Sequence, residues 1–288
     1  MMDFDGGLLS EGRETRRRMR KQDNGGMEEG MTSLAVVRHS DGEIRPDQDL
    51  VAEEMPVALV FNGISHAVMM ATPLDLERLA VGFALSEGIV GRRAEIFDVE
   101  ADFVAGGAEV RLEIAQPAFL ALKGRRRSLE GRSGCGVCGI ESLALLDLAP
   151  GPMATPVRPV IAEAAAIARA AAELPAHQRL MRATGCAHAA AWCGRDGEVK
   201  AVFEDVGRHN ALDKLIGWLA LEGMDPGDGF AFMSSRASYE LARKCARAGI
   251  PLLATISAPT SLAVDIARRA GVALASFCRQ NGFVEYTA

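Results

Sequence analysis

The chain lacks several features that would place it in a common class of protein. Its 288 residues contain no run of roughly 18 or more apolar residues, so no segment is expected to cross a membrane. Neither a GxxxxGK[ST] run nor a GxGxxG run occurs, so an ordinary NTPase or a Rossmann dehydrogenase is not indicated. A basic surplus is also missing, because the formal net charge is −6, and we expect no binding to nucleic acid.

The N-terminus lacks the apolar segment of an export signal. Arg16 and Arg17 suggest a twin-arginine signal, but no apolar stretch follows them. Residues 1–33 are charged and show no periodicity, which predicts a disordered N-terminal extension. We therefore expect a cytoplasmic protein whose six cysteines are reduced, with Cys193 and Cys245 packed in the core.

Residues 34–131 are predicted to form a small α+β domain. The dipeptide Asn62-Gly63 lies between two β-type runs and predicts a hairpin. Thr72 followed by Pro73 is typical of a helix start, with Thr72 as the N-cap residue. Gly106-Gly107 predicts the turn of a second hairpin.

Residues 140–288 are predicted to form an α/β domain. After an alanine-rich helical stretch, an apolar strand, a polar loop and a helix follow one another three times. The three strands are placed at 201–203, 230–233 and 251–256, and a last strand at 272–277. This alternation predicts βαβ units and a largely parallel sheet.

The loops of this repeat would lie together at the carboxyl ends of the strands. Open α/β sheets bind ligands at this edge, and the free N–H groups of helix N-termini favour anions. Asn210 and Ser235 could also do no more than cap helices. The side chains that could hold a phosphate or pyrophosphate here are Arg208, His209, Asn210, Ser234, Ser235, Arg236, Thr260, Ser261 and Arg279.

Two cysteines at CxxC spacing form the segment most suggestive of chemistry. Cys135 and Cys138 lie among three glycines in residues 132–139, after a basic run at 123–127. Positive charge lowers the pKa of a thiol, and glycine lets a backbone move. The pattern favours a persulfide carrier on a mobile loop. A thioredoxin-like pair fits less well, because the glycines weaken the helix that it needs. Two inert cysteines in a turn are a further alternative.

A zinc site is another alternative interpretation of the thiol pair. His188 with Cys186 or Cys193 could add the two ligands that Cys135 and Cys138 would need, although the spacing is irregular. The protein would then be a zinc-stabilised nucleotide-binding or scaffold protein without catalysis. The carrier interpretation, which we prefer, includes no metal ligand.

Six motifs follow one another along the chain. They lie at 53–57 (EEMPV), 72–77 (TPLDLE), 133–139 (SGCGVCG), 184–190 (TGCAHAA), 204–214 (EDVGRHNALDK) and 234–240 (SSRASYE). With them, residues 51–287 resemble the formate dehydrogenase accessory sulfurtransferase (FdhD) family. The resemblance implies a cytidine-deaminase-like α/β C-terminal domain with a smaller N-terminal α+β part. Deaminase chemistry is not implied, because the H-x-E motif upstream of P-C-x-x-C is missing.

The resemblance also implies a function. Such proteins are sulfur carriers required for formate dehydrogenase activity, and they receive sulfur as a persulfide from a cysteine desulfurase. They pass it to the molybdenum cofactor, Mo-bis(molybdopterin guanine dinucleotide), before its insertion into the catalytic subunit of formate dehydrogenase. A homodimer is left open.

The resemblance assigns roles to particular residues of this chain. The persulfide cysteine corresponds to Cys135, and Cys138 is its partner in the loop. Cys186 stands where the family commonly has a small residue without a thiol, which leaves its role open. The implied cofactor-contacting residues, to which we add Arg236, are Phe277, Cys278, Arg279, Gln280, Asn281 and Gly282.

Overall fold

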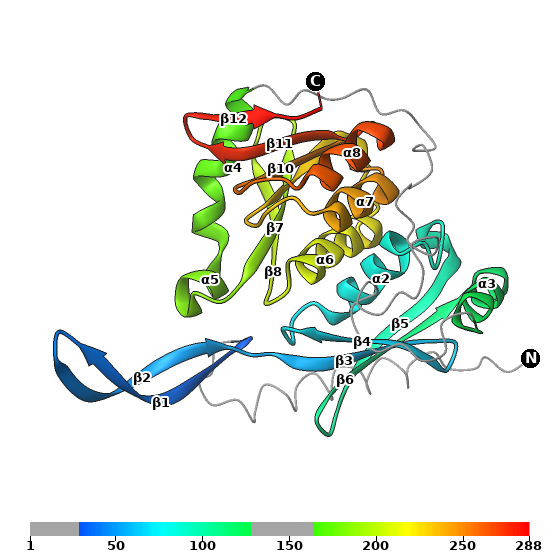
Figure 1. The fold of residues 1–288 in the computed structure, drawn as a ribbon. Coiled ribbons are helices and arrows are strands. Elements are labelled where there is room, and N and C mark those ends of the chain that lie inside the picture. Colours follow the sequence, from blue (N-terminus) through cyan, green and yellow to red (C-terminus); the bar gives the residue numbers. More distant parts are fainter. Residues whose placement is uncertain (1–28, 128–163, 288) are drawn as a thin grey trace, which may run out of the picture.

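The described residues form a six-stranded sheet, a four-stranded sheet, a separate two-stranded hairpin and the helices that pack against the two larger sheets (Figure 1). The computed structural model describes residues 29–127 and 164–287. Going through the molecule, the layers are a helix layer, a six-stranded sheet, a second helix layer and a four-stranded sheet. The predicted mixed α/β fold class is confirmed, whereas the likeness to cytidine deaminases stays a prediction.

The four-stranded sheet belongs to the N-terminal half and has the order β4-β3-β6-β5. Both predicted hairpins are confirmed, since β3 pairs antiparallel with β4 and β5 with β6. Strands β3 and β6 pair in parallel at the centre of this sheet, which was not predicted. The elements are β3 (Met55–Phe61), β4 (Ile64–Ala71), α2 (Leu76–Ser86), the short η1 (Arg93–Glu95), β5 (Ile96–Val104), β6 (Gly107–Ile114) and α3 (Gln116–Arg127).

Helix α2 begins later than the sequence predicts. Its N-cap residue is Asp75, which makes no side-chain capping bond. Thr72, the predicted N-cap, is buried, and its N–H donates to the Asp205 carboxylate at 3.1 Å. Its hydroxyl accepts from the N–H of Val206 at 3.2 Å. Thr72 is therefore used in a contact with the C-terminal half, so the prediction that it caps α2 is wrong.

A long hairpin precedes this sheet. It consists of β1 (Met31–Ser40) and β2 (Glu43–Ala52), which pair only with each other among the described strands. The first strand thus begins inside the stretch 1–33 that was predicted to be disordered, and residues 1–28 lie outside the described residues. Most side chains of this hairpin are exposed, so neither strand has the apolar alternation by which a sequence pattern reveals a strand.

The six-stranded sheet belongs to the C-terminal half and has the order β12-β11-β10-β9-β7-β8. Strands β9, β10 and β11 are parallel, as predicted, but β7 lies antiparallel between β8 and β9. The strands are β7 (His188–Gly194), β8 (Val199–Asp205), β9 (Gly229–Met233), β10 (Leu252–Thr255), β11 (Ala273–Arg279) and β12 (Gly282–Glu285).

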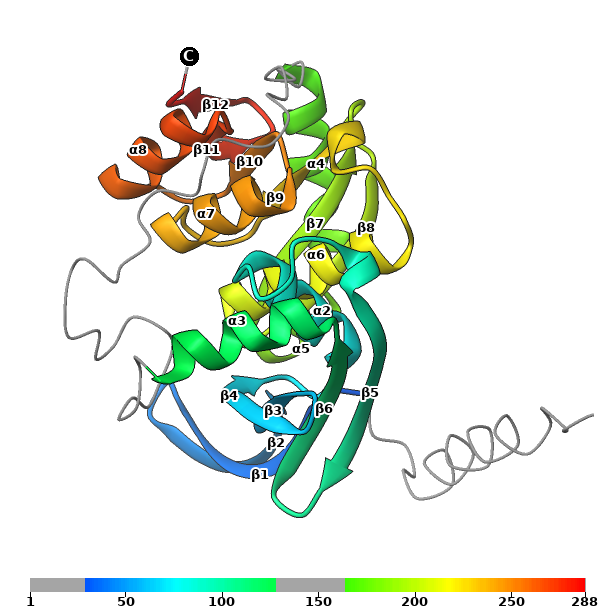
Figure 2. The ribbon, with the colours of Figure 1, turned by 90° about the vertical axis from the view of Figure 1, so that its right-hand side faces the viewer.

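Helices cover both faces of this second sheet (Figure 2). Helices α6, α7 and α8 pack on one face and α4 on the other. Their bounds are α4 (Ala164–His177), α5 (Arg179–Thr184), α6 (Arg208–Leu221), the short η3 (Pro226–Asp228), α7 (Tyr239–Ala248) and α8 (Ser261–Ala270). No helix in residues 29–127 and 164–287 is both long and apolar enough to cross a membrane.

The two halves meet where α2 crosses α6. A Cβ atom added at Gly82 of α2 would lie 1.7 Å from the carbonyl oxygen of Asp213, and one added at Gly217 of α6 would lie 1.9 Å from that of Arg78. Both distances are far below van der Waals contact, so only glycine allows the two backbones to approach this closely. Leu79 of the same helix packs into the core of the four-stranded sheet. Helix α2 therefore joins both halves into one body.

We expect the change Gly82→Ala or Gly217→Ala to lower the free energy of unfolding by about 1–3 kcal/mol or more, because either methyl group forces the helices apart. Gly124→Ala is the matched control, since Gly124 lies in helix α3 with open space around its Cβ position. There, alanine should raise helix stability by up to about 1 kcal/mol. Urea unfolding of the three variants measures both effects. Equal stabilities would contradict the close crossing.

Candidate functional site

The carboxyl ends of four strands meet at one edge of the six-stranded sheet, as the repeat predicted. Strands β8, β9, β10 and β11 all end at this edge, and β7, which is antiparallel to its neighbours, begins there. His188 of β7 consequently lies opposite Asp205 of β8. Four loops and the start of β7 thus surround one place, which we call the carboxyl edge.

Hydrogen bonds hold the loops of the carboxyl edge against one another. The N–H of Ala189 donates to the Ser234 hydroxyl at 2.8 Å, which joins the start of β7 to the loop after β9. The Arg279 guanidinium donates to the carbonyl oxygen of Ile256 at 2.6 Å and to that of Cys278 at 2.8 Å. The loop after β10 and the last hairpin are thereby fixed to each other. The edge is an ordered surface in which an arginine already has a defined position.

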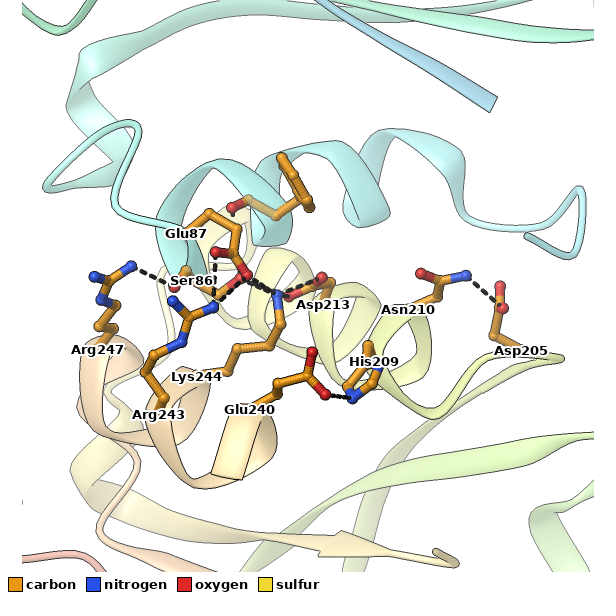
Figure 3. Close-up of polar contacts among 11 residues, drawn as sticks. Ser86, Glu87, Asp205, His209, Asn210, Asp213, Glu240, Arg243, Lys244 and Arg247 are labelled. Carbon is orange, nitrogen blue, oxygen red and sulfur yellow. Dashed lines mark hydrogen bonds and ion pairs between the residues drawn. The ribbon is translucent and has the colours of Figure 1, made fainter. Parts of the chain in front are cut away.

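A histidine–carboxylate pair lies at the start of helices α6 and α7. His209 Nε2 lies 2.6 Å from Glu240 Oε2 (Figure 3), and Arg208 Nη2 lies 3.9 Å from the same oxygen. Burial disfavours ionisation of Glu240, but His209 and Arg208 outweigh it and lower its pKa. Burial, together with the charges of Arg208 and His209, lowers the pKa of His188. The neutral form of His188 is thereby favoured beside Arg208 and His209.

Two buried donors at this edge have no hydrogen-bond partner within the described residues. They are Nε of Arg208 and the hydroxyl of Ser238. Ser238 is the N-cap residue of α7, yet its side chain makes no capping bond. Buried polar atoms in proteins are almost always paired, so an unpaired one calls for an explanation. A polar or anionic ligand at the carboxyl edge would supply the acceptors.

Asn210 and Ser235 turn out to be structural, but neither caps a helix. The N-cap residue of α6 is Gly207 and not Asn210. The Asn210 amide donates to Asp205 at 2.9 Å (Figure 3) and to the carbonyl oxygen of Met70 at 2.7 Å. Ser235 donates to the carbonyl oxygen of Arg236. The capping interpretation is wrong for both, because Asn210 bonds to β4 and to Asp205, and Ser235 bonds to the next residue of its own loop. Asn210, bonded on both sides in the interior, is not available to a ligand.

Buried ion pairs fix the 204–214 motif to the N-terminal half. Asp205 and Lys214 are both fully buried, and Nζ lies 2.6 Å from Oδ2. Lys214 also donates to the carbonyl oxygens of Thr72 and Glu204 at 3.3 and 3.2 Å. The motif therefore contributes a buried anchor as well as Arg208 and His209.

A second buried network lies farther along α6. Lys244 Nζ lies 2.9 Å from Asp213 and 2.8 Å from Glu87 (Figure 3). Arg243 adds a 2.8 Å contact to Glu87. Burial disfavours the charged form of Glu87. The charges and hydrogen bonds of Lys244 and Arg243 together have the larger effect and lower its pKa to about 2. This network ties the end of α2 to α6 and α7.

The segment implied to contact the cofactor runs from the end of β11 through the turn at 280–281 to the first residue of β12. Phe277 has a left-handed backbone (φ 55), and its side chain is 45% exposed. Such a conformation is strained for a bulky residue, and strain of this kind gathers at functional sites. Arg279 and residues 280–282 are exposed, whereas the Cys278 side chain is buried in the core. Arg236 is exposed in the loop after β9. The structure thus brings Arg236 and the exposed part of this segment to the carboxyl edge.

The sequence matches the model of the FdhD/NarQ family over residues 52–288. The chain belongs to the FdhD/NarQ family. A relative from Chromobacterium violaceum named "Sulfur carrier protein FdhD" is 84% identical over 270 residues, which cover 94% of this chain and 100% of the relative. A protein of the same name from Burkholderia cenocepacia is 60% identical over 263 residues, covering 89% of this chain and 94% of that protein.

A solved structure supports the fold of this family member. It comes from Desulfotalea psychrophila and is described as that of a proposed formate dehydrogenase accessory protein. It superimposes with a TM-score of 0.68 at 23% identity, covering 90% of this chain and 97% of that one. At this identity the likeness shows the fold alone.

The cysteines of this FdhD/NarQ protein divide by exposure. Cys193, Cys245 and Cys278 are buried, which confirms the packing predicted for the first two. Burial raises the pKa of all three thiols, to about 12 for Cys245 and about 11 for Cys278, and so makes them poor nucleophiles. Cys186 is exposed. The predicted mobile CxxC loop, 132–139, which carries Cys135 and Cys138, lies outside the described residues.

The structure excludes one of the two ligand sets that the zinc interpretation allowed, namely His188 with Cys193. His188 begins β7 and Cys193 lies near its end, so about 17 Å of strand separates them and one ion cannot bind both. Cys186 and His188 remain neighbours. Within residues 29–127 and 164–287 there is no group of three or more His, Cys, Asp or Glu side chains that could hold a metal.

We expect Lys214→Met to lower the free energy of unfolding by about 3–5 kcal/mol, because it leaves Asp205 charged and unpaired in the interior. Adding Asp205→Asn should recover part of this loss, since the uncompensated charge is then gone. Chemical denaturation of both variants measures the difference. If the single variant were as stable as the wild type, the ion pair would not anchor the motif.

Proposed function

We propose that this chain is a sulfur carrier required for formate dehydrogenase activity, and that it carries the sulfur as a persulfide on Cys135. Family membership supports the carrier role, as does the name shared by relatives that are 84% and 60% identical. The observation that carries the proposal is the division of the cysteines. A carrier thiol must be exposed and ionisable, which Cys193, Cys245 and Cys278 are not.

The loading step is thiol exchange. The Cys135 thiolate attacks the outer sulfur of a persulfide on a cysteine desulfurase. A new sulfur–sulfur bond forms on Cys135, the bond in the donor breaks, and the donor cysteine leaves as a thiolate. No oxidant or reductant is needed. Cys138 lies close enough in sequence to assist the transfer, or to attack the inner sulfur of the persulfide, so that a disulfide forms and the outer sulfur leaves as hydrosulfide.

The acceptor in this proposal is the molybdenum cofactor with its two guanine dinucleotides, bound as a substrate at the carboxyl edge. The guanidinium groups of Arg236 and Arg279 suit phosphate oxygens. The unpaired donors of Arg208 and Ser238 offer further hydrogen bonds. Exposed Phe277 could stack on a guanine base, an interaction worth about 1–3 kcal/mol for bases on aromatic side chains.

The size of the carboxyl edge also fits an extended ligand. Arg208 follows β8 and Arg279 ends β11, and β7, β9 and β10 lie between these two strands. At about 4.8 Å between neighbouring strands, the two arginines are separated by roughly 19 Å along the edge. A dinucleotide can cover such a distance, whereas a single phosphate cannot. The formate dehydrogenase catalytic subunit would then receive the cofactor from this edge.

We expect Cys135→Ser to abolish activation of a co-expressed formate dehydrogenase without changing the thermal midpoint of the carrier. Cys138→Ser should weaken activation. Cys186→Ser is the matched control, because Cys186 is an exposed thiol outside the CxxC motif, and it should leave activation unchanged. Formate oxidation in extracts measures the three variants. Full activation by the Cys135 variant would eliminate the persulfide role.

We expect GDP, a fragment of the cofactor, to bind weakly, and Arg236→Ala to reduce its affinity about ten- to a hundredfold. Arg279→Ala should have a similar effect. Arg195→Ala is the control, since Arg195 lies in the turn between β7 and β8, at the opposite edge of the sheet. Isothermal titration compares the affinities. Equal binding by all four proteins would move the site away from the carboxyl edge.

A further inference from the structure

The four-stranded sheet leaves one of its faces exposed. Helix α2 packs on the inner face, and Leu122 of α3 joins the same core. The side chains of the other face, which we call the outer face, alternate with those buried beneath α2. Two side chains of β4 on this outer face are apolar, with Val68 58% and Met70 50% exposed, and Val104 at the end of β5, on the opposite edge of the sheet, is 55% exposed.

The part of the outer face formed by β5 and β6 is acidic. Its cross-strand pairs on β5 and β6 are Asp98 with Glu113, Glu100 with Arg111 and Asp102 with Glu109. Arg111 contacts Glu100, Asp102 and Glu109, whose side chains are still 54%, 39% and 38% exposed. Five carboxylates thus surround a single arginine. Because like charges on neighbouring strands repel, this face favours a cationic partner.

We propose that residues 13–21 of this chain, the basic segment, bind the outer face of the four-stranded sheet. The basic segment reads RETRRRMRK and holds six basic residues and one acidic residue. Its charge is therefore opposite to that of the outer face. Met19 provides one apolar side chain for the exposed row that contains Val68 and Met70.

The place where the chain leaves the fold suits this contact. A Cβ atom at Gly30 would lie 2.8 Å from Leu74 and 3.3 Å from Thr72, so the described chain begins beside the end of β4. Residues 22–28 connect this point to the basic segment and can span about 23–25 Å when extended. The full width of the sheet, from β4 to β5, is only about 14 Å. The basic segment can therefore reach every strand of the outer face.

The physics of the contact predicts strong dependence on salt. Each exposed ion pair contributes only about 0–1 kcal/mol, and salt screens it. The connection through the chain compensates, because a short tether holds the segment at an effective concentration in the millimolar range. The contact should therefore form at low ionic strength and weaken as the Debye length falls from about 30 Å at 0.01 M to about 3 Å at 1 M.

Zero-length carbodiimide cross-linking of the full chain, followed by peptide mass mapping, tests this inference. Lys21 should couple to Asp102 or Glu109 within the monomer at low salt. The yield should fall about threefold or more at 1 M salt. Arg16→Glu, Arg17→Glu and Arg18→Glu together should cause a similar loss. Adding Asp98→Lys and Glu113→Lys to that triple variant should recover part of the cross-link to Asp102 or Glu109, because the outer face then carries no net charge and no longer repels the acidic segment.

The matched control reverses two exposed carboxylates elsewhere, Asp265→Lys and Glu285→Lys, on α8 and β12. This variant should keep the cross-link of the wild type. Coupling of Lys21 to Asp265, Glu285 and the outer face with equal yield would overturn the proposal. Cross-links found only between two copies of the chain would also overturn it, because the occupant would then be a neighbouring molecule.

Discussion

The contact between α2 and α6 is the constraint on which the rest of the structure depends. Gly82 and Gly217 bring the two helices to a separation that no side chain permits. At that separation, buried charges pair across the interface, with Lys244 between Asp213 of α6 and Glu87 at the end of α2. A buried charge without its partner is strongly destabilising. Arrangements of the helices that would separate these charges are therefore disfavoured. The N-terminal sheet is thereby held at a fixed position against the second sheet.

This constraint extends to the carboxyl edge. Thr72 and Asp205 bind each other across the two halves, and Lys214 neutralises Asp205 in the interior. The loop that starts at Asp205 carries Arg208 and His209 to the edge, where Glu240 of α7 meets them. The proposed ligand site is therefore built from both halves, although its direct contacts come from the C-terminal one. A change in the buried anchor would displace the site without touching a ligand.

Several parts of this arrangement could be predicted from the sequence. Asn62-Gly63 indicated its hairpin, and the repeated strand, loop and helix placed Arg236 and Arg279 at one edge. The antiparallel position of β7 and the parallel pairing of β3 with β6 could not be predicted, because register between distant strands is set by tertiary packing. The roles of Asn210 and Thr72 could not be predicted either, because they too depend on contacts between distant segments. Each carries the residue type of a helix cap, but its polar group bonds to a segment more than 130 residues away. Cys135, the proposed persulfide cysteine, was chosen from the sequence alone, since its motif is local.

The central claim is that one thiol of six carries the sulfur. Incubation of the protein with a cysteine desulfurase and cysteine, followed by alkylation and peptide mass mapping, locates the added sulfur directly. The account predicts a gain of about 32 Da, one sulfur atom, on the peptide with Cys135, removable by reductant. It predicts no gain on the peptides that contain Cys193, Cys245 or Cys278. Sulfur on one of those buried thiols, or on Cys186 with Cys135 unmodified, would contradict the account.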